Sequence, residues 1–128
     1  MIPVGLGIDL VDVPRVAKMI ERFGDRVLSR LLTPGEREYC ESQAAIAQHV
    51  AARLAAKEAA FKALAASGEV SYMGWLEFEV AREIDGRPTL RFHGRARELA
   101  ARLEIEVTHV SLTHTDSYAA AVVAVYRD

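Results

Sequence analysis

A carboxylate and an amine stand four residues apart in this sequence, at Glu58 and Lys62. On a helix this spacing makes the two side chains neighbours on one face. The pair suits phosphate chemistry, because oxygen-ligated magnesium bridges phosphate oxygens and a lysine adds a point positive charge. A metal site would need a second carboxylate, for which Asp9 is the candidate. The residues themselves leave alternatives open, since the pair can form a solvated, salt-bridged helix face and Asp9 can be a surface turn carboxylate.

The segment that holds this pair predicts the longest helix of the chain. Residues 42–66 are rich in alanine and contain neither proline nor glycine, so one long helix or two in succession are expected. On a helical wheel of residues 53–65, the alanines occupy one half and can pack closely against a sheet. The other half holds Arg53, Leu54, Lys57, Glu58, Phe61 and Lys62. Because Leu54 and Phe61 lie within this charged half, part of it is expected to be buried.

Asp9 lies in a segment with the two-residue period of a strand. In residues 4–11 an apolar set (Val4, Leu6, Ile8 and Leu10) alternates with Gly5, Gly7, Asp9 and Val11. This is the period of a strand with one buried face, and Asp9 is expected to point away from the main apolar set. Its same-face neighbours Gly5 and Gly7 lack side chains, which would let a bulky group approach the backbone beside it.

Turn and capping signals place the remaining elements. Pro14 suits the first turn of a helix that ends near Gly24, and Thr33 to Glu36 is typical of a capping box that begins another helix. Further elements are predicted over residues 26–32 (helix), 75–80 and 89–92 (a hairpin), 94–103 (helix), and 107–112 and 118–125 (two closing strands). Together they predict one α+β domain over residues 1–128.

Two further features could serve a function. The first predicted helix carries Arg15, Lys18 and Arg22 on one face, which would attract an acidic protein partner or be merely solvated. Nucleic acid is a poor candidate partner, because the chain is slightly acidic and this helix lacks interleaved aromatic residues. His114 lies in a hydroxyl-rich connection between two predicted strands, and such loops often carry function, although a lone loop histidine is more often structural.

Bulk composition narrows the class of protein. With 128 residues, about half of them apolar, and a formal net charge of -2, the chain fits one ordinary globular domain, and its overall charge does not identify a partner. The single cysteine, Cys40, excludes an internal disulfide framework and makes a reducing cytoplasm the expected location. No signal peptide is recognisable, and no apolar run approaches the roughly 20 residues of a membrane span.

In combination, the motifs resemble those of the holo-[acyl-carrier-protein] synthase family, the short, trimeric class of 4'-phosphopantetheinyl transferases. The matching stretches occur in family order and cover nearly the whole chain: residues 5–16 (GLGIDLVDVPRV), 32–36 (LTPGE), 51–64 (AARLAAKEAAFKAL), 86–88 (GRP) and 110–115 (VSLTHT). The resemblance implies the 4'-phosphopantetheinyl transferase fold, an antiparallel-rich sheet packed against a long alanine-rich helix. Residues 65–68 and 72–75 depart from the family pattern.

The resemblance also implies roles for single residues. Asp9 and Glu58 match the magnesium ligands, and Lys62 matches a lysine that contacts phosphate, so these three are the expected catalytic residues. Positions associated with the coenzyme A pocket, some of them supplied across the interface of a homotrimer, are matched by Arg53, Pro88, His114 and Thr115. Arg15, on the face shared with Lys18 and Arg22, matches the arginine that docks the carrier.

The implied activity is transfer of the 4'-phosphopantetheine moiety of coenzyme A to a serine of apo-acyl carrier protein, with release of adenosine 3',5'-bisphosphate. Glu58, a metal-bound water and His114 all remain candidates for removing the serine proton. Two other classes are weighed against this activity: a trimer that binds coenzyme A or a nucleotide without catalysis, and a hydrolase of nucleotide diphosphates. The matches at Arg15 and at residues 111–114 argue against both.

Overall fold

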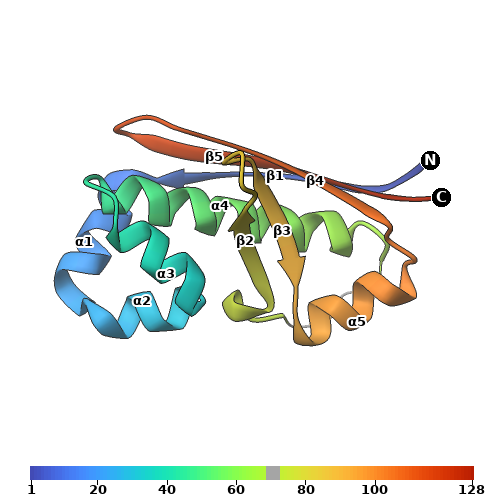
Figure 1. The fold of residues 1–128 in the computed structure, drawn as a ribbon, viewed down its shortest axis with the longest axis horizontal. Helices are drawn as coiled ribbons and strands as arrows, with labels where there is room; N and C mark the ends of the chain where they lie inside the picture. The colour runs from blue at the N-terminus through green and yellow to red at the C-terminus, as the bar shows by residue number, and fades with distance from the viewer. Residues whose placement is uncertain (69–72) are drawn as a thin grey trace.

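The computed structural model describes residues 1–68 and 73–128 and shows a mixed α+β architecture (Figure 1). Its elements are β1 (Ile2–Asp12), α1 (Val13–Phe23), α2 (Asp25–Leu31), α3 (Pro34–Glu41), α4 (Ile46–Ala65), the 3₁₀ helix η1 (Trp75–Glu77), β2 (Phe78–Arg82), β3 (Pro88–Phe92), α5 (Gly94–Arg102), β4 (Val107–His114) and β5 (Tyr118–Arg127). An antiparallel sheet has the strand order β1-β5-β4, and β2 pairs with β3 in a separate hairpin. The predicted class and the long alanine-rich helix are confirmed.

The helix α4 packs directly on one face of the three-stranded sheet, at very short range. A Cβ atom added to Gly7 would lie 1.8 Å from the carbonyl oxygen of Ala59, and one added to Gly5 would lie 1.9 Å from that of Ala63. Only glycine fits at these positions, and the alanine side of α4 completes the close approach. The alanines of α4 in this contact are fully buried.

The buried face of β1 is therefore the glycine face. Leu6, Ile8 and Leu10 point outward and are 68%, 64% and 62% exposed, respectively. Asp9 does point away from this apolar set, as its alternation predicts, but it points toward α4 and not into open solvent. The glycine face is buried because only residues without side chains let the backbone of β1 lie against the backbone of α4.

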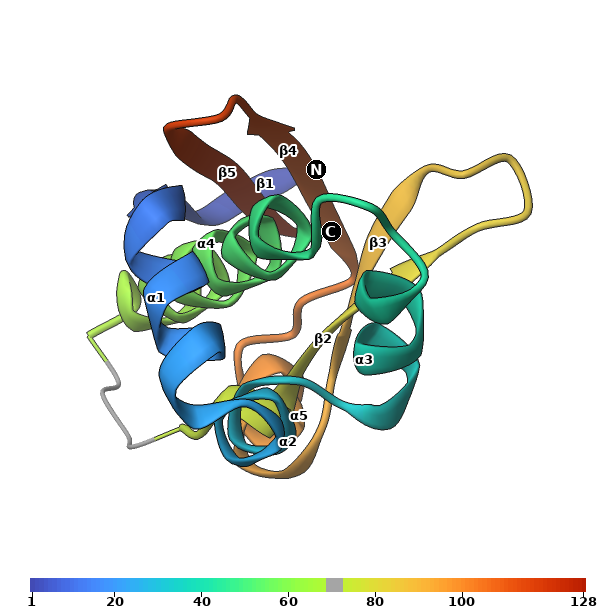
Figure 2. The ribbon, with the colours of Figure 1, turned by 90° about the vertical axis from the view of Figure 1, so that its left-hand side faces the viewer.

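Two hydrophobic clusters flank α4. One joins its C-terminal half to the sheet, the β2–β3 hairpin and α5, and the other joins its N-terminal half to α1, α2 and α3. Figure 1 shows the sheet along one side of α4 with the remaining elements on the other. Figure 2 shows the β2–β3 hairpin extending away from the body of the molecule.

Most predicted boundaries agree with the structure to within a few residues. Asp12 caps α1 by accepting a hydrogen bond from the backbone N–H of Arg15, and Gly24 follows the helix. The capping box of Thr33 and Glu36 forms at the start of α3 as predicted. One exception is residues 42–45, which lie outside α4, and another is His114, which is the last residue of β4 and not a loop residue. A third is the strand predicted over residues 75–80: its first half, Trp75–Glu77, is the 3₁₀ helix η1, and β2 begins only at Phe78.

No helix in residues 1–68 and 73–128 is long and apolar enough to cross a membrane.

Candidate active site

The structure brings Lys62 of α4 to Asp9 of β1. The Nζ atom of Lys62 lies 3.1 Å from Oδ1 of Asp9 and donates a second hydrogen bond, also of 3.1 Å, to the backbone oxygen of Ile8. The Asp9 side chain is 21% exposed and the Lys62 side chain 51%, so solvent and ligands can reach the pair. Lys62 therefore bridges helix and strand, and the alternative of a salt bridge from Glu58 to Lys62 along the helix is not formed.

Glu58 lies on the same stretch of α4 that faces Asp9. The chain directions are opposite, since Gly5 abuts Ala63 and Gly7 abuts Ala59. Two strand residues and four helix residues each advance about 6 to 7 Å, so Asp9 faces the stretch of α4 centred near residues 55–59. Glu58 belongs to this stretch of α4, and its side chain is half-buried.

Asp9 and Glu58 supply carboxylate oxygens, which are the ligands that magnesium prefers. Lys62 occupies one oxygen of Asp9, whereas the other oxygen of Asp9 and both oxygens of Glu58 have no hydrogen-bond partner in the described part of the chain. No cluster of three or more His, Cys, Asp or Glu residues that could hold a metal occurs there either. Two carboxylates are a donor set that could hold a magnesium ion whose remaining ligands come from phosphate and water.

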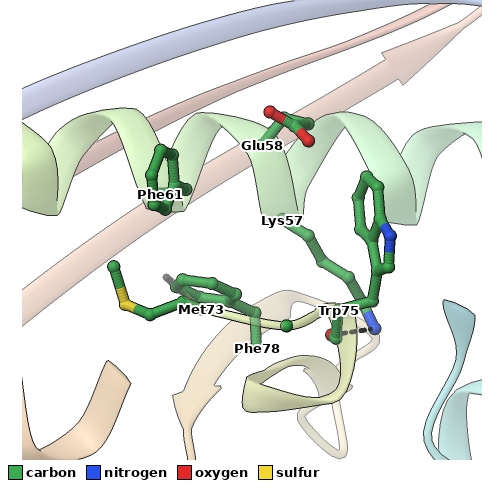
Figure 3. A pocket seen from close by; sticks show the side chains of 7 residues that line it. Lys57, Glu58, Phe61, Met73, Trp75 and Phe78 are labelled. Atoms are coloured by element: carbon green, nitrogen blue, oxygen red, sulfur yellow. Dashed lines mark hydrogen bonds between the residues drawn. The ribbon is translucent and has the colours of Figure 1, made fainter. Parts of the chain in front are cut away.

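A cavity of about 230 Å³ opens beside Glu58. Apart from Glu58 and Lys57, its walls are apolar or glycine, contributed by Phe61, Met73, Gly74, Trp75 and Phe78. Figure 3 shows that Glu58 leaves α4 on the side away from Lys57, whose ammonium points toward the backbone of Trp75. Tyr72, part of the segment that departs from the family pattern, lies outside the described residues, whereas Gly74 and Trp75 form part of the cavity wall.

Arg53 belongs to a second cluster, built around the ring of Tyr39 in α3. The guanidinium carbon of Arg53 lies 4.5 Å from the ring centroid and that of Arg82 lies 4.7 Å from it. The ring of His49 meets the Tyr39 ring edge-on at 5.6 Å and the His114 ring at 5.2 Å. Three cationic or titratable side chains thus surround the Tyr39 ring and His114 adds a fourth through His49, an arrangement that favours binding of an anion.

The positive charges of this cluster disfavour protonation of His49. Burial lowers the pKa of His49, and the neighbouring charges of Arg53, His114 and Arg82 lower it further. Arg53 is only 2% exposed, and its Nε atom is buried without a hydrogen-bond partner among the described residues. Such a group costs free energy unless a ligand or water satisfies it.

Pro88 and Thr115 lie at the edges of this second cluster. Pro88 begins β3 and pairs across the hairpin with Arg82. The hydroxyl oxygen of Thr115 accepts hydrogen bonds from the backbone N–H groups of Ser117 and Tyr118, both at 3.1 Å, so it shapes the β4–β5 connection. The predicted coenzyme A positions therefore divide: Lys62 lies with Asp9, whereas Arg53 and His114 lie in the second cluster.

Sequence reasoning missed three members of this cluster: His49, Tyr39 and Arg82. One signal was available for His49, which precedes Arg53 by four residues and so shares its helix face. Tyr39 and Arg82 come from other elements, and no spacing in the sequence links them to Arg53.

The predicted basic face of α1 is present. Arg15, Lys18 and Arg22 are all exposed. Beside them, between α1 and α2, lies a cavity of about 410 Å³. Its lining combines apolar and basic side chains, those of Met19, Phe23, Arg26, Val27 and Arg30. This surface offers both positive charge and apolar contact.

Comparison with known proteins assigns the chain to a family. The model of the 4'-phosphopantetheinyl transferase superfamily matches residues 5–123. The chain belongs to this superfamily. A holo-[acyl-carrier-protein] synthase of Koribacter versatilis is 50% identical over 119 residues, which are 93% of this chain and 94% of that protein. The holo-[acyl-carrier-protein] synthase of Geobacter sulfurreducens is 43% identical over 96% of this chain and 97% of its own length.

Solved structures of superfamily members share the fold. The acyl carrier protein synthase of Mycobacterium tuberculosis superposes with a TM-score of 0.79 at 38% identity, over 98% of this chain and 99% of its own. A holo-(acyl-carrier-protein) synthase from Bacillus anthracis, solved in complex with coenzyme A (3',5'-ADP), gives a TM-score of 0.77 at 29% identity, with complete coverage of both chains. The predicted family and fold are confirmed.

Proposed function

We propose that this protein transfers the 4'-phosphopantetheine moiety of coenzyme A to a serine of an apo-acyl carrier protein and releases adenosine 3',5'-bisphosphate. The observation that carries the proposal is the meeting of Asp9 and Lys62 beside Glu58 in a chain that is 50% identical to a holo-[acyl-carrier-protein] synthase. The Bacillus anthracis relative with coenzyme A bound supports coenzyme A as the donor.

The residues present divide the chemistry between them. Asp9 and Glu58 would hold a magnesium ion, which when bound offsets negative charge that develops on the pyrophosphate. Lys62, half-exposed, can turn from Asp9 to a phosphate oxygen and add a fixed positive charge. The serine oxygen forms a bond to the phosphorus that bears pantetheine, and the bond from that phosphorus to the adenosine bisphosphate oxygen breaks.

Glu58 is the residue best suited to remove the serine proton. Its carboxylate has no hydrogen-bond partner among the described residues, so in the proposed site it would be free to accept a proton. His114 is less suited within one subunit, because its ring packs on His49 in the other cluster.

We also propose that the working protein is a homotrimer with sites between subunits. The outer face of the sheet pairs the exposed Leu6, Ile8 and Leu10 with Ala124, Val122 and Ala120 of β5, a wide apolar surface of the kind that marks protein interfaces. Because the resemblance implies that some coenzyme A positions act across the subunit interface, we infer that the Tyr39 cluster of a neighbouring copy would lie near the Asp9 site of the first. One coenzyme A would then have its pyrophosphate near Asp9 and another phosphate near the partner's cationic cluster.

The carrier would dock on α1. Arg15, Lys18 and Arg22 present an exposed positive face, which would attract an acidic surface on the carrier. The apolar floor formed by Met19 and Phe23 would add buried contact to this attraction. We place the reaction in the cytoplasm, where the free thiol of Cys40 stays reduced.

The test is to mix the protein with an apo carrier, coenzyme A and magnesium, and to measure the mass of the carrier. We expect the mass of the phosphopantetheine arm to be added, and chelation of magnesium to abolish the gain. Glu58→Gln and Asp9→Ala should each lose nearly all transfer while remaining folded, whereas the matched surface variant Glu98→Gln on α5 should keep it. A protein that binds coenzyme A but adds no mass would be a non-catalytic binder, and full activity of Glu58→Gln would refute the metal site.

A further inference from the structure

Lys57 precedes Glu58 in α4, yet its side chain is fully buried and faces the interior. Its ammonium group makes three hydrogen bonds: 2.7 Å to the backbone oxygen of Leu31, 2.6 Å to Oε1 of Glu36, and 2.9 Å to the backbone oxygen of Trp75. An ammonium has three donors, so all of them are used. Lys57 therefore has no donor left for a phosphate, in spite of its place beside Glu58.

Glu36, the partner of Lys57, is equally buried and equally satisfied. Its Oε1 atom also accepts the backbone N–H of Thr33, as part of the capping box of α3, and its Oε2 atom accepts the backbone N–H of Val80 in β2 at 2.8 Å. The ion pair thus ties together the end of α2, the start of α3, the helix η1, the strand β2 and the helix α4.

Stability alone is a weak reason for such a pair. Removing two charges from water costs free energy that their mutual attraction often only balances, and apolar replacements of similar volume are often neutral or stabilising. For Lys57 the cost of burial is visible in its pKa. Burial lowers this pKa by more than the charge of Glu36 raises it. The distinctive result of the pair is geometric, since it sets the distance between α4 and the backbone of Trp75.

That distance matters because Trp75 forms a wall of the cavity beside Glu58. The same cavity is lined by Lys57, Glu58 and Trp75, and Figure 3 shows the hydrogen bond from Lys57 to the Trp75 carbonyl. We propose that the Lys57–Glu36 pair is a positioning pair for the transfer reaction, which holds the Trp75 wall against the helix that carries Glu58. The role in transfer rests on the proposed function, whereas the hold on Trp75 does not.

The sequence supplies its own probe, because Trp75 is the single tryptophan. The test variant is the double substitution Lys57→Met/Glu36→Gln, which removes both charges and the bond to Trp75. The glutamine keeps an oxygen for the capping box at this helix position. Val125→Ala in the buried part of β5 is the matched control, because it opens a core cavity without touching the pair or the Trp75 wall.

We expect the double variant to remain folded by circular dichroism. Its Trp75 emission should move to longer wavelength with stronger acrylamide quenching, and its kcat/KM for coenzyme A should fall about 10-fold to 100-fold. Val125→Ala should lower Tm but leave the Trp75 emission and the KM of the folded protein unchanged. Glu36→Gln alone, which keeps the hydrogen bond from Lys57 to Trp75, should show a smaller shift of emission.

The proposal is overturned if the folded double variant has wild-type emission and wild-type kcat and KM. It is equally overturned if activity falls only in proportion to the folded fraction, as in Val125→Ala, because the pair would then be merely structural. Failure of the proposed function looks different, since the wild-type protein itself would then add no mass to a carrier. In that case the role in transfer falls, and the emission measurement still decides whether the pair holds the Trp75 wall.

Discussion

Replacing Gly7 by alanine would disturb the candidate site through the backbone alone. The added Cβ atom would lie 1.8 Å from the carbonyl oxygen of Ala59 and 2.7 Å from its carbonyl carbon, where ordinary contacts begin at 3.4 Å. The atoms in conflict belong to the backbones of β1 and α4, so no side chain can rotate away. The strand and helix must separate by about 1.6 Å, the difference between 3.4 and 1.8 Å, or distort locally to the same extent.

This separation should cost both stability and activity. Overpacking of a well-packed core typically costs about 1 to 3 kcal/mol, and a conflict between two backbones belongs at or above the upper end. For a domain of this size, about 3 kcal/mol lowers Tm by roughly 10 °C. Asp9 lies two residues from Gly7 on the same strand face, so the carboxylate moves with it. A displacement of about 1 Å at a reacting group can reduce the rate about 100-fold.

Two other glycines provide matched controls. Gly5→Ala has an equally severe conflict, 1.9 Å from the Ala63 oxygen, but lies four residues from Asp9, so it should lose similar stability and less activity per folded molecule. Gly35→Ala in α3 meets only the end of the Glu79 side chain at 3.3 Å and should keep wild-type activity. Thermal unfolding and the carrier mass assay measure both effects. A Gly7→Ala protein with wild-type Tm and transfer rate would refute the close packing of β1 on α4.

Three further outcomes follow from other parts of the molecule. Arg15→Glu on α1 should weaken carrier binding several-fold at low salt and reduce the salt dependence of this binding. The same charge change in Arg97→Glu on α5 should do neither, and titration with the carrier at two salt concentrations measures the affinity of both variants. Burial raises the pKa of Cys40 to about 11, so a thiol reagent should react with it near neutral pH only after unfolding, and any fast reaction of the folded protein would contradict its burial. Burial acts to raise the pKa of Glu79, but hydrogen bonds from His93 and Thr33 outweigh burial and lower this pKa. The lowered pKa stabilises the folded protein above about pH 4.5, and this stability is lost as the pH falls through the lowered value. Glu79→Gln should therefore make the free energy of unfolding in urea depend less on pH in the acid range.

Local signals in the sequence were sufficient to predict each α-helix, although not all of their boundaries, and part of the site. The capping box of Thr33 and Glu36 predicts the start of α3, and Gly24 predicts the end of α1, because each satisfies backbone groups that only a helix end exposes. The long helix that carries Glu58 and Lys62 was predicted from its composition. Its start at Ile46 was not, because residues 42–45 contain no glycine or proline to mark the break.

The pairing of Lys62 with Asp9 could not be read from spacing. The two residues are 53 positions apart, and helix periodicity offered Glu58 as the nearer partner for Lys62. The bond forms because Gly5 and Gly7 let β1 approach α4 closely enough for the lysine to reach the strand. Likewise, helical periodicity placed Lys57 with the charged residues, whereas its acceptors come from three distant segments that only the tertiary fold assembles.

The orientation of β1 shows why strand periodicity has two solutions. Alternation predicts that one set of residues is buried, and hydrophobicity alone selects Leu6, Ile8 and Leu10. Within a single subunit the glycine set is buried instead, because α4 can come within backbone contact of it, and the apolar set is left in solvent. Both sets would be covered only if another copy packs on the outer face. On that reasoning Ile8→Glu, at the centre of the face, should yield a folded monomer with little transfer activity, and sizing chromatography would measure it. An unchanged oligomer in Ile8→Glu would mean that this apolar face is not where the subunits meet.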